Sequence, residues 1–219
     1  MSSFPEITPS LVVPPIDASL INNWQNPQQQ PAKLAIMASG NGSNFEAVAG
    51  AIASGILHAQ IQVVIYNNPD AYVAQRAKSW GIPAILINHR EFNSRQDFDR
   101  AIVKVLLDYQ VEWVVMAGWM RLVTQVLIDA FPQRIINIHP SLLPSFKGVR
   151  AIEQALAAGV KITGCTVHLV CLEVDSGPIL IQAAVPILPG DTPQTLHERV
   201  QIEEHRILPI GIALAIHKI

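Results

Sequence analysis

The chain has 219 residues, of which 50% are hydrophobic and 15% charged, a composition typical of a globular protein. Its 15 basic and 17 acidic side chains give a formal charge of −2 at pH 7, which argues against a polyanionic partner such as nucleic acid. The most apolar runs have the length of strands and fall short of the ~20 residues that a membrane-spanning helix needs. We therefore expect no nucleic-acid partner, no membrane span, and a core large enough to fold without metal or disulfide staples.

The first 32 residues differ in composition from the rest of the chain. They hold six of the 16 prolines and no Lys or Arg, so they lack the basic stretches that are typical of signal and transit peptides. We predict a proline-rich, poorly ordered tail over residues 1–32 and a single domain over residues 33–219. A docking function for residues Leu11–Ile16 is the less favoured alternative to a plain extension.

The spacing of the two cysteines, Cys165 and Cys171, indicates whether the protein belongs to an oxidising or a reducing cellular compartment. They lie six residues apart in one predicted strand, which places them on the same face but too far apart for a disulfide. Unpaired thiols favour a reducing environment, and we expect a cytoplasmic protein.

From residue 33 onward, short apolar runs alternate with segments of helical periodicity. The expected strands are Leu34–Ala38, Ile61–Tyr66, Ala84–Ile87, Trp113–Ala117 and Arg134–Ile138. The expected helices are Asn44–Ala53, Ala71–Trp80, Ser94–Tyr109, Thr124–Ala130, Ala151–Ala158 and one from Pro193 onward. Two more strands, joined by the turn Asp175–Pro178, are expected before the last helix. This order predicts an α/β fold of the Rossmann-like type: an open, mainly parallel twisted sheet with helices on both faces and an antiparallel addition near the C-terminus.

A glycine-rich turn follows the first expected strand and opens the first expected helix. Its sequence, Ser39-Gly-Asn-Gly-Ser-Asn44, offers unpaired backbone N–H groups at a helix start, which attract an anion. Phe45 stands where the dinucleotide fingerprint needs a third glycine, and the Lys-Ser/Thr ending of a P-loop is missing, so a nicotinamide cofactor or ATP is disfavoured. The turn predicts a phosphate site, unless Ser43 or Asn44 merely caps the helix.

The end of the fifth expected strand carries the best candidates for chemistry. Strand alternation puts Asn137 and His139 on one face, and Pro140 ends regular pairing, so both side chains lie at the carboxyl edge of the sheet, where open α/β folds bind ligands. An amide and an imidazolium side by side suit acyl transfer, because both donate N–H groups to a developing oxyanion. A buried pair that only satisfies backbone groups is the alternative.

A third candidate lies in the turn Val174-Asp-Ser-Gly-Pro178. If Asp175 reaches His139, its carboxylate favours the imidazolium and fixes the orientation of the ring. The alternative is a turn-forming Asp that is bonded to its own backbone.

The remaining polar candidates are weaker. His168 falls inside an expected strand and is predicted to pack beside the site rather than to react. Gln201 and Glu204 share a face of the last helix, so they either hydrogen-bond sugar hydroxyls or form a solvated polar face. His197 and His205 on the same helix have no metal-ligand spacing, and we expect no metal.

The three motifs in this order, Ser39–Asn44, Asn137–Pro144 and Val174–Pro178, closely resemble those of the phosphoribosylglycinamide formyltransferases, a family of folate-dependent enzymes of de novo purine biosynthesis. The resemblance runs from about Lys33 to the C-terminus. It implies that phosphoribosylglycinamide is the acceptor and 10-formyltetrahydrofolate the formyl donor, with no metal. The expected state is a monomer or a homodimer that binds only small-molecule substrates.

The resemblance also assigns roles to individual residues. It implies catalysis by Asn137, His139 and Asp175. It implies that the ribonucleotide is bound by Gly42, Ser43, Asn44, Gln201 and Glu204. It implies that the folate is bound by Arg95, Met120, Arg121, Leu122, Val123 and Asn137, with Arg95 on the glutamate carboxylate. The alternative for Arg95 is an exposed helix-start arginine paired with Asp97 or Asp99.

One departure and three competing functions remain. Family members often carry a histidine in the loop around Gly148–Ile152, where this chain has none, and Arg150 is the expected substitute beside the phosphate. Formyltetrahydrofolate hydrolases and methionyl-tRNA formyltransferases share the Asn-x-His and distal Asp pattern, but these enzymes carry additional domains that we do not expect here. A non-catalytic phosphometabolite-binding module is the alternative outside this superfamily.

Overall fold

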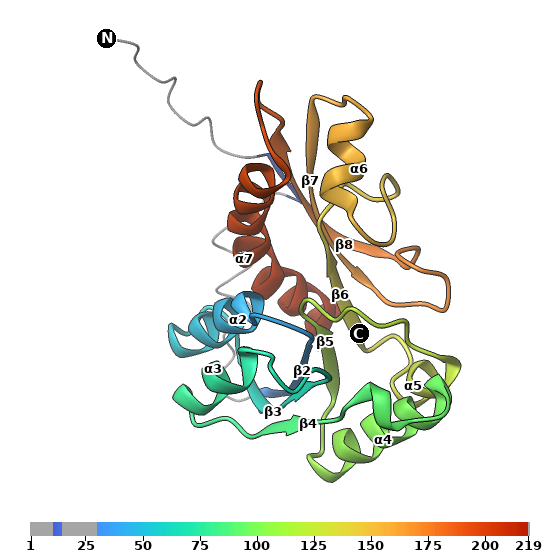
Figure 1. Ribbon diagram of the computed structural model, residues 1–219. Helices are drawn as coiled ribbons and strands as arrows, with labels where there is room; N and C mark the ends of the chain where they lie inside the picture. Colours follow the sequence, from blue (N-terminus) through green and yellow to red (C-terminus); the bar gives the residue numbers. More distant parts are fainter. Residues whose placement is uncertain (1–10, 15–29, 219) are drawn as a thin grey trace.

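A computed structural model describes residues 11–14 and 30–218 and shows an eight-stranded sheet with the order β1-β8-β7-β6-β5-β2-β3-β4 (Figure 1). The strands are β1 (Val12–Val13), β2 (Ala32–Ala38), β3 (Ala59–Tyr66), β4 (Ala84–Leu86), β5 (Trp113–Met116), β6 (Ile135–His139), β7 (Ile162–Leu169) and β8 (Ile179–Pro186). The helices are α2 (Ser43–Ala53), α3 (Val73–Ser79), α4 (Arg95–Asp108), α5 (Gln125–Ala130), α6 (Ala151–Ala157) and α7 (Pro193–Lys218), with a 3-10 turn at His89–Glu91.

The sheet is mixed in the way that the sequence predicts. Strands β2 to β6 pair parallel to one another, whereas β6–β7, β7–β8 and β1–β8 are antiparallel. The parallel part follows from the alternation of strands and helices, since each helix carries the chain back to the same end of the sheet. The predicted α/β fold with an antiparallel addition is therefore confirmed.

Two hydrophobic cores cover the two faces of the sheet. Strand β2 is buried on both sides and alternates between them, with Leu34 and Ile36 facing one core and Ala35 and Met37 the other. Helices α2, α3 and α7 pack on the first face, and α4 and α5 on the second (Figure 1). This sandwich leaves the carboxyl ends of the parallel strands as the edge where polar groups can gather.

The predicted elements are found within one or two residues of their expected bounds, with three differences. The pairing of β1 with β8, between Val12 and Ala183 and between Val13 and Gln182, was not predicted, because two residues carry no readable periodicity. The turn at His89–Glu91 was also missed. Strand β7 ends at Leu169, so Cys171 lies beyond it rather than in the same strand as Cys165.

Strand β1 falls inside the segment that we expect to be a tail. Most of that segment lies outside the described residues, and so do Pro15 and Ile16 of the alternative docking stretch Leu11–Ile16, so the division at residue 32 stays a prediction. Across residues 11–14 and 30–218, no helix combines the length and the apolar character that crossing a membrane demands.

Candidate active site

Strand β6 presents Asn137 and His139 on one face, next to the antiparallel strand β7. In the register, Asn137 lies opposite His168 and His139 opposite Thr166. The His139 side chain is buried, with 5% of the residue exposed. Because β6 ends at His139, before Pro140, both polar groups stand at the carboxyl end of the strand as predicted.

The connection between β7 and β8 brings Asp175 to this point. Asp175 has a left-handed backbone with a φ of 49°. Two residues on, Gly177 lies against the end of β7 so closely that a Cβ atom there would stand 1.9 Å from the Leu169 carbonyl oxygen. Only glycine fits at that position, and the tight turn projects the Asp175 carboxylate back toward β6.

The three predicted catalytic side chains meet. The Oδ2 atom of Asp175 lies 3.3 Å from His139 Nδ1, and Asn137 Nδ2 donates to Asp175 Oδ1 over 3.5 Å. The backbone N–H of Gly148 donates to the same Oδ2 atom over 2.8 Å. The Asp175 side chain is only 9% exposed, so these interactions are shielded from bulk water.

Both ring nitrogens of His139 face acceptors. Nδ1 faces the Asp175 carboxylate, and Nε2 lies 2.8 Å from the Phe146 carbonyl oxygen. A carbonyl and a carboxylate accept but do not donate, so satisfying both requires a proton on each nitrogen. Both nitrogens of His139 are thus placed to donate an N–H to an acceptor.

The Asp175 carboxylate is held in its charged form. Burial favours the neutral acid, but the neighbouring His168 imidazole, the N–H of Gly148 and the charge of His139 outweigh burial and lower the pKa of Asp175. An ionised Asp175 and a protonated His139 thus stabilise each other.

His168 belongs to this cluster as a buried supporting group. Its Nδ1 atom lies 2.8 Å from the Leu169 carbonyl oxygen, and its Nε2 atom lies 3.1 Å from Asn137 Nδ2 and 3.6 Å from Asp175 Oδ1. The prediction that it packs beside the site fits this position. Phe146 and Gly148, whose backbone groups contact His139 and Asp175, were not predicted as site residues from the sequence. Their nearness to His139 in the chain was the one available signal.

The glycine-rich turn opens α2 without a side-chain cap. Gly42 is the N-cap residue, with a φ of 77°, and no side chain bonds to the first N–H groups of α2. Ser43 and Asn44 instead contact α7: Gln201 Nε2 donates to Ser43 Oγ over 3.0 Å, and Asn44 Nδ2 donates to Glu204 Oε2 over 3.0 Å. The capping alternative does not describe these side chains, and the helix start keeps N–H groups for an anion.

Glu204 is buried beside this turn, with 5% of the residue exposed. Burial raises the pKa of its carboxyl group, opposed in part by the hydrogen bond from Asn44 and the charge of His197. The structure thus brings together the five residues that the resemblance assigns to the ribonucleotide, and it does so next to the segment assigned to the folate. Ser39 Oγ, in the glycine-rich turn, joins the two parts, because it accepts from the backbone N–H of Met120 in the folate segment over 2.8 Å.

The folate segment lies beside a basic cavity. Met120 and Leu122 are exposed, at 75% and 53%. A cavity of about 200 Å³ nearby is lined by His89, Phe92, Asn93, Ser94, Arg95, Phe98 and Arg121. Of the two alternative partners of Arg95, Asp97 pairs with Arg100, and Asp99 accepts from the Thr124 N–H over 2.6 Å. Burial raises the pKa of Asp99, opposed in part by its bonds to Thr124 and by the charge of Arg95, so Arg95 acts on Asp99 through its charge, and no direct ion pair joins them among the described residues. Arg95 and Arg121 therefore face a space that suits a carboxylate ligand.

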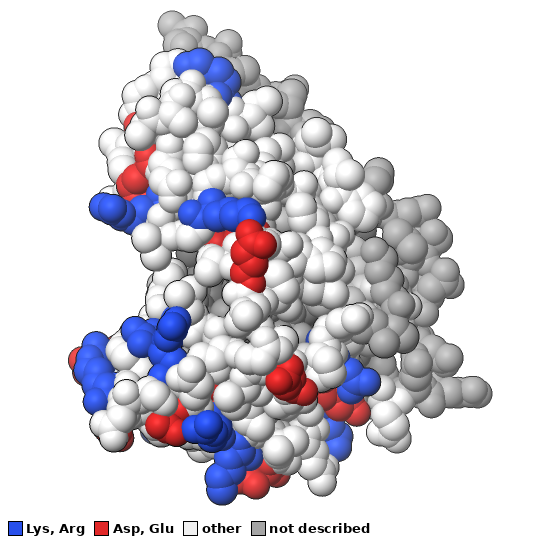
Figure 2. Space-filling view, turned by 90° about the vertical axis from the view of Figure 1, so that its right-hand side faces the viewer, with Lys and Arg blue, Asp and Glu red and all other residues white. Residues whose placement is uncertain are grey.

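Lys and Arg side chains lie both above and below a hollow at the left edge of the space-filling view (Figure 2). Arg150 is exposed at the start of α6, and its predicted place beside the phosphate stays a prediction. Within the described ranges 11–14 and 30–218, no group of His, Cys, Asp and Glu side chains has the arrangement of a metal site.

Comparison with known proteins places the chain in a family. A model of the family described as Formyl transferase matches residues 32–212. The chain belongs to the formyl transferase family. A phosphoribosylglycinamide formyltransferase from Bacillus subtilis (strain 168) is 40% identical over 177 residues, which cover 81% of this chain and 91% of that protein. The resemblance inferred from the three motifs is thereby confirmed.

Three further comparisons agree. The human trifunctional purine biosynthetic protein adenosine-3 is 42% identical over 198 residues, which cover 90% of this chain; the chain spans about a fifth of the length of that relative. The solved structure of glycinamide ribonucleotide transformylase 1 from Symbiobacterium toebii is 45% identical and superposes with a TM-score of 0.84, covering 85% of this chain and 88% of that one. A phosphoribosylglycinamide formyltransferase from Bacillus halodurans superposes with a TM-score of 0.80 at 42% identity, covering 84% and 93% of the two chains.

Proposed function

We propose that this protein transfers the formyl group of 10-formyltetrahydrofolate to the amine of phosphoribosylglycinamide, a step of de novo purine biosynthesis. The observation that carries the proposal is the contact of Asp175 with both His139 and Asn137 in a chain of the formyl transferase family. The names of the relatives and structural neighbours support the choice of substrates.

The proposed chemistry is direct transfer through a tetrahedral intermediate. The substrate amine attacks the formyl carbon, the carbonyl oxygen becomes an oxyanion, and the N–H groups of Asn137 and His139 stabilise it. Asp175 keeps His139 charged and relays a proton from the attacking amine through water to the folate nitrogen, whose bond to the formyl carbon then breaks, so that the carbonyl reforms and tetrahydrofolate leaves. Because His139 Nε2 faces the Phe146 carbonyl, that N–H exchanges this acceptor for the oxyanion when substrate binds.

We place the ribonucleotide on the turn that opens α2. The phosphate binds the N–H groups of Gly42, Ser43 and Asn44, where the helix dipole and the missing side-chain cap favour an anion. Gln201 and Glu204 then bind the ribose hydroxyls. Arg150 is the proposed additional neighbour of the phosphate, and an unchanged ribonucleotide KM in Arg150→Ala would remove it from the proposal.

The folate belongs beside the exposed segment of residues 120–123. Backbone groups of Met120, Arg121, Leu122 and Val123 bind the pteridine, near Asn137. The Arg95 guanidinium binds the glutamate carboxylate in the basic cavity, where its planar fork matches the two carboxylate oxygens. In this account the folate is a cosubstrate, and the protein needs no resident metal.

The proposal is tested by following deformylation of 10-formyltetrahydrofolate spectrophotometrically, with and without phosphoribosylglycinamide. Transfer predicts that deformylation depends on the acceptor. Release at the same rate without acceptor would identify a hydrolase, and the absence of any deformylation would identify a binding module.

We further propose that the protein works in the cytoplasm as a monomer or homodimer.

A further inference from the structure

The segment Phe146–Val149 contacts both His139 and Asp175. Its Phe146 carbonyl accepts from His139 Nε2 over 2.8 Å, and its Gly148 N–H donates to Asp175 Oδ2 over 2.8 Å. One short segment thus contacts the Nε2 side of the His139 ring and the Asp175 oxygen that faces His139. Lys147 lies between these two backbone contacts, and the proposed chemistry gives its side chain no part.

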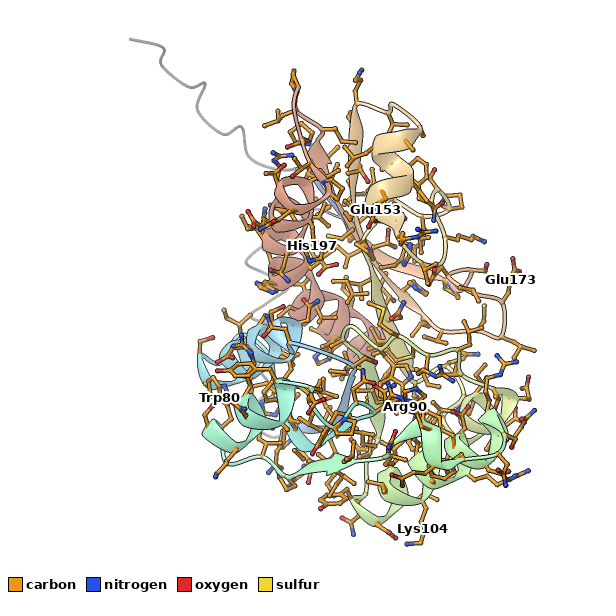
Figure 3. The ribbon with its side chains drawn as sticks, in the orientation of Figure 1. Trp80, Arg90, Lys104, Glu153, Glu173 and His197 are labelled. Atoms are coloured by element: carbon orange, nitrogen blue, oxygen red, sulfur yellow. The ribbon has the colours of Figure 1, made fainter. Side chains whose placement is uncertain are left out.

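Lys147 connects this segment to the turn that carries Asp175. Its Nζ atom donates to Ser176 Oγ over 2.5 Å and lies 3.6 Å from Glu173 Oε1. Ser176 Oγ in turn donates to the Val174 carbonyl oxygen over 2.9 Å. Figure 3 shows Glu173 on the β7–β8 connection. The two residues that Lys147 contacts therefore stand on either side of Asp175 in the chain.

The backbone is constrained at both ends of the Lys147–Ser176 hydrogen bond. Asp175 has a φ of 49°, in the left-handed region that is unfavourable for a residue with a Cβ atom. On the other side, Gln154 Nε2 from α6 donates to the Val149 carbonyl over 2.8 Å and to the Lys147 carbonyl over 3.2 Å. The segment is thus fixed to α6, and Lys147 transmits that fixed position to the Asp175 turn.

We propose that Lys147 is a positioning residue, which holds the Asp175 turn against His139 by bridging the segment Phe146–Val149 to Ser176. This inference rests on the proposed function, because it concerns the geometry of the formyl transfer. An exposed ion pair adds little to stability. A hydrogen-bonded ammonium between the Asp175 turn and a segment that contacts His139 and Asp175 has a larger effect on rate, since displacements of about 1 Å cost up to 10²-fold.

The bridge also affects the charge state of Asp175. The titratable groups that contact this carboxylate are His139 from β6 and His168 from β7, whereas Lys147 and Glu173 pair with each other beside the turn. Removing Lys147 loosens the turn and with it the Gly148 hydrogen bond, one of the interactions that lower the pKa of Asp175, and this change favours the neutral acid. The pKa of Asp175 then rises, and because transfer needs the carboxylate, the acid limb of the kcat profile moves to higher pH.

The test compares Lys147→Met, Lys147→Arg and Ser176→Ala with the matched control Lys104→Met. Lys104 pairs with Asp108 on the exposed side of α4, at the lower edge of Figure 3, away from the site. Lys147→Met is expected to lower kcat about tenfold with little change in either KM and to move the acid limb upward. Lys147→Arg should restore most of the rate, Ser176→Ala should lose part of it, and Lys104→Met should match the wild type.

Wild-type kcat and an unmoved acid limb in Lys147→Met would overturn the inference, as would a change confined to thermal stability or to KM. If Lys147→Met does not fold, Ser176→Ala decides, because it removes the hydrogen-bond acceptor of Lys147 and keeps the Lys147 charge. An unchanged kcat in Ser176→Ala then overturns the proposed positioning role. Acceptor-dependent transfer by the wild type is measured first. If the wild type shows no acceptor-dependent transfer, the proposed function is contradicted. If it does, and Lys147→Met keeps the wild-type kcat and acid limb, only the positioning role is contradicted.

Discussion

The Nδ1 atom of His139 lies 3.3 Å from the Oδ2 atom of Asp175, at the point where β6 ends and the β7–β8 connection turns back toward the sheet. The contact is buried, so the attraction between an imidazolium and a carboxylate is weakly screened. It joins a residue placed by strand alternation to one placed by a tight glycine turn. The proposed chemistry depends on this contact.

Breaking the contact at either end should slow the reaction without weakening substrate binding. We expect His139→Ala and Asp175→Asn each to lower kcat by about 10² to 10⁴-fold with modest changes in KM, because both groups act mainly in the transition state. Steady-state kinetics on both substrates measures this. Near wild-type turnover in either folded variant would end the mechanism.

Asn137 is expected to contribute to the rate through one N–H group that donates to the oxyanion. Removing one N–H donor to an oxyanion typically lowers kcat about 10² to 10³-fold, and we expect this loss in Asn137→Ala. Since Asn137 also donates to Asp175, a circular dichroism melt should accompany the kinetics, to show that the variant keeps its fold. A loss that appears only in KM would show that Asn137 binds substrate uniformly instead of stabilising the oxyanion.

The turn at Gly42 should not tolerate a side chain. A Cβ atom at Gly42 would stand 2.5 Å from Val73 Cγ2, and the φ of 77° adds strain. Gly42→Ala is therefore expected to raise the ribonucleotide KM and to cost about 1–3 kcal/mol of stability. The double variant Gly42→Ala/Val73→Ala measures the part due to the Val73 Cγ2 atom, because Val73 Cβ, 2.7 Å from the new Cβ atom, and the backbone strain both remain. A fully additive double-mutant cycle would show that the contact with Cγ2 plays no part.

The ion pair between Asp191 and Arg199 predicts a pH-dependent stability. Arg199 makes two hydrogen bonds to the Asp191 carboxylate, of 2.7 and 3.0 Å, and they are the main reason that the pKa of Asp191 is lowered. A lowered pKa stabilises the fold above the unfolded value of about 3.9, and the stabilisation is lost as the pH falls further. Asp191→Asn should thus cost about 1 kcal/mol at pH 7.

That cost should shrink progressively below about pH 4, where the wild type loses the same interaction. Urea unfolding of both proteins from pH 7 to pH 3 measures the difference. A difference that stays constant over this range would mean that the carboxylate charge of Asp191 does not contribute.

Much of the fold was predictable because each local pattern agreed with the global arrangement. The alternation in β2 is visible in the sequence, as is the strand that carries Asn137 and His139. The end of that strand at Pro140 was predictable for the same reason. These features depend on neighbours in the chain, which a sequence reports directly.

Other parts of the site depend on contacts that no local pattern encodes. The backbone groups of Phe146 and Gly148 carry no side-chain signature. Ser43 and Asn44 are typical capping residues, yet they bond to α7 because Gly42 takes the cap position. The same holds for Asp175, whose turn was predicted but whose distance to His139 depends on how β7 and β8 pack.

The most direct test of the account follows a labelled formyl carbon from donor to product. With 10-formyltetrahydrofolate carrying a ¹³C formyl group, the wild type should place the label on the acceptor nitrogen of phosphoribosylglycinamide, one label for each acceptor consumed, and His139→Ala should place almost none. Label recovered as free formate, or equal labelling by the wild type and His139→Ala, would contradict the account.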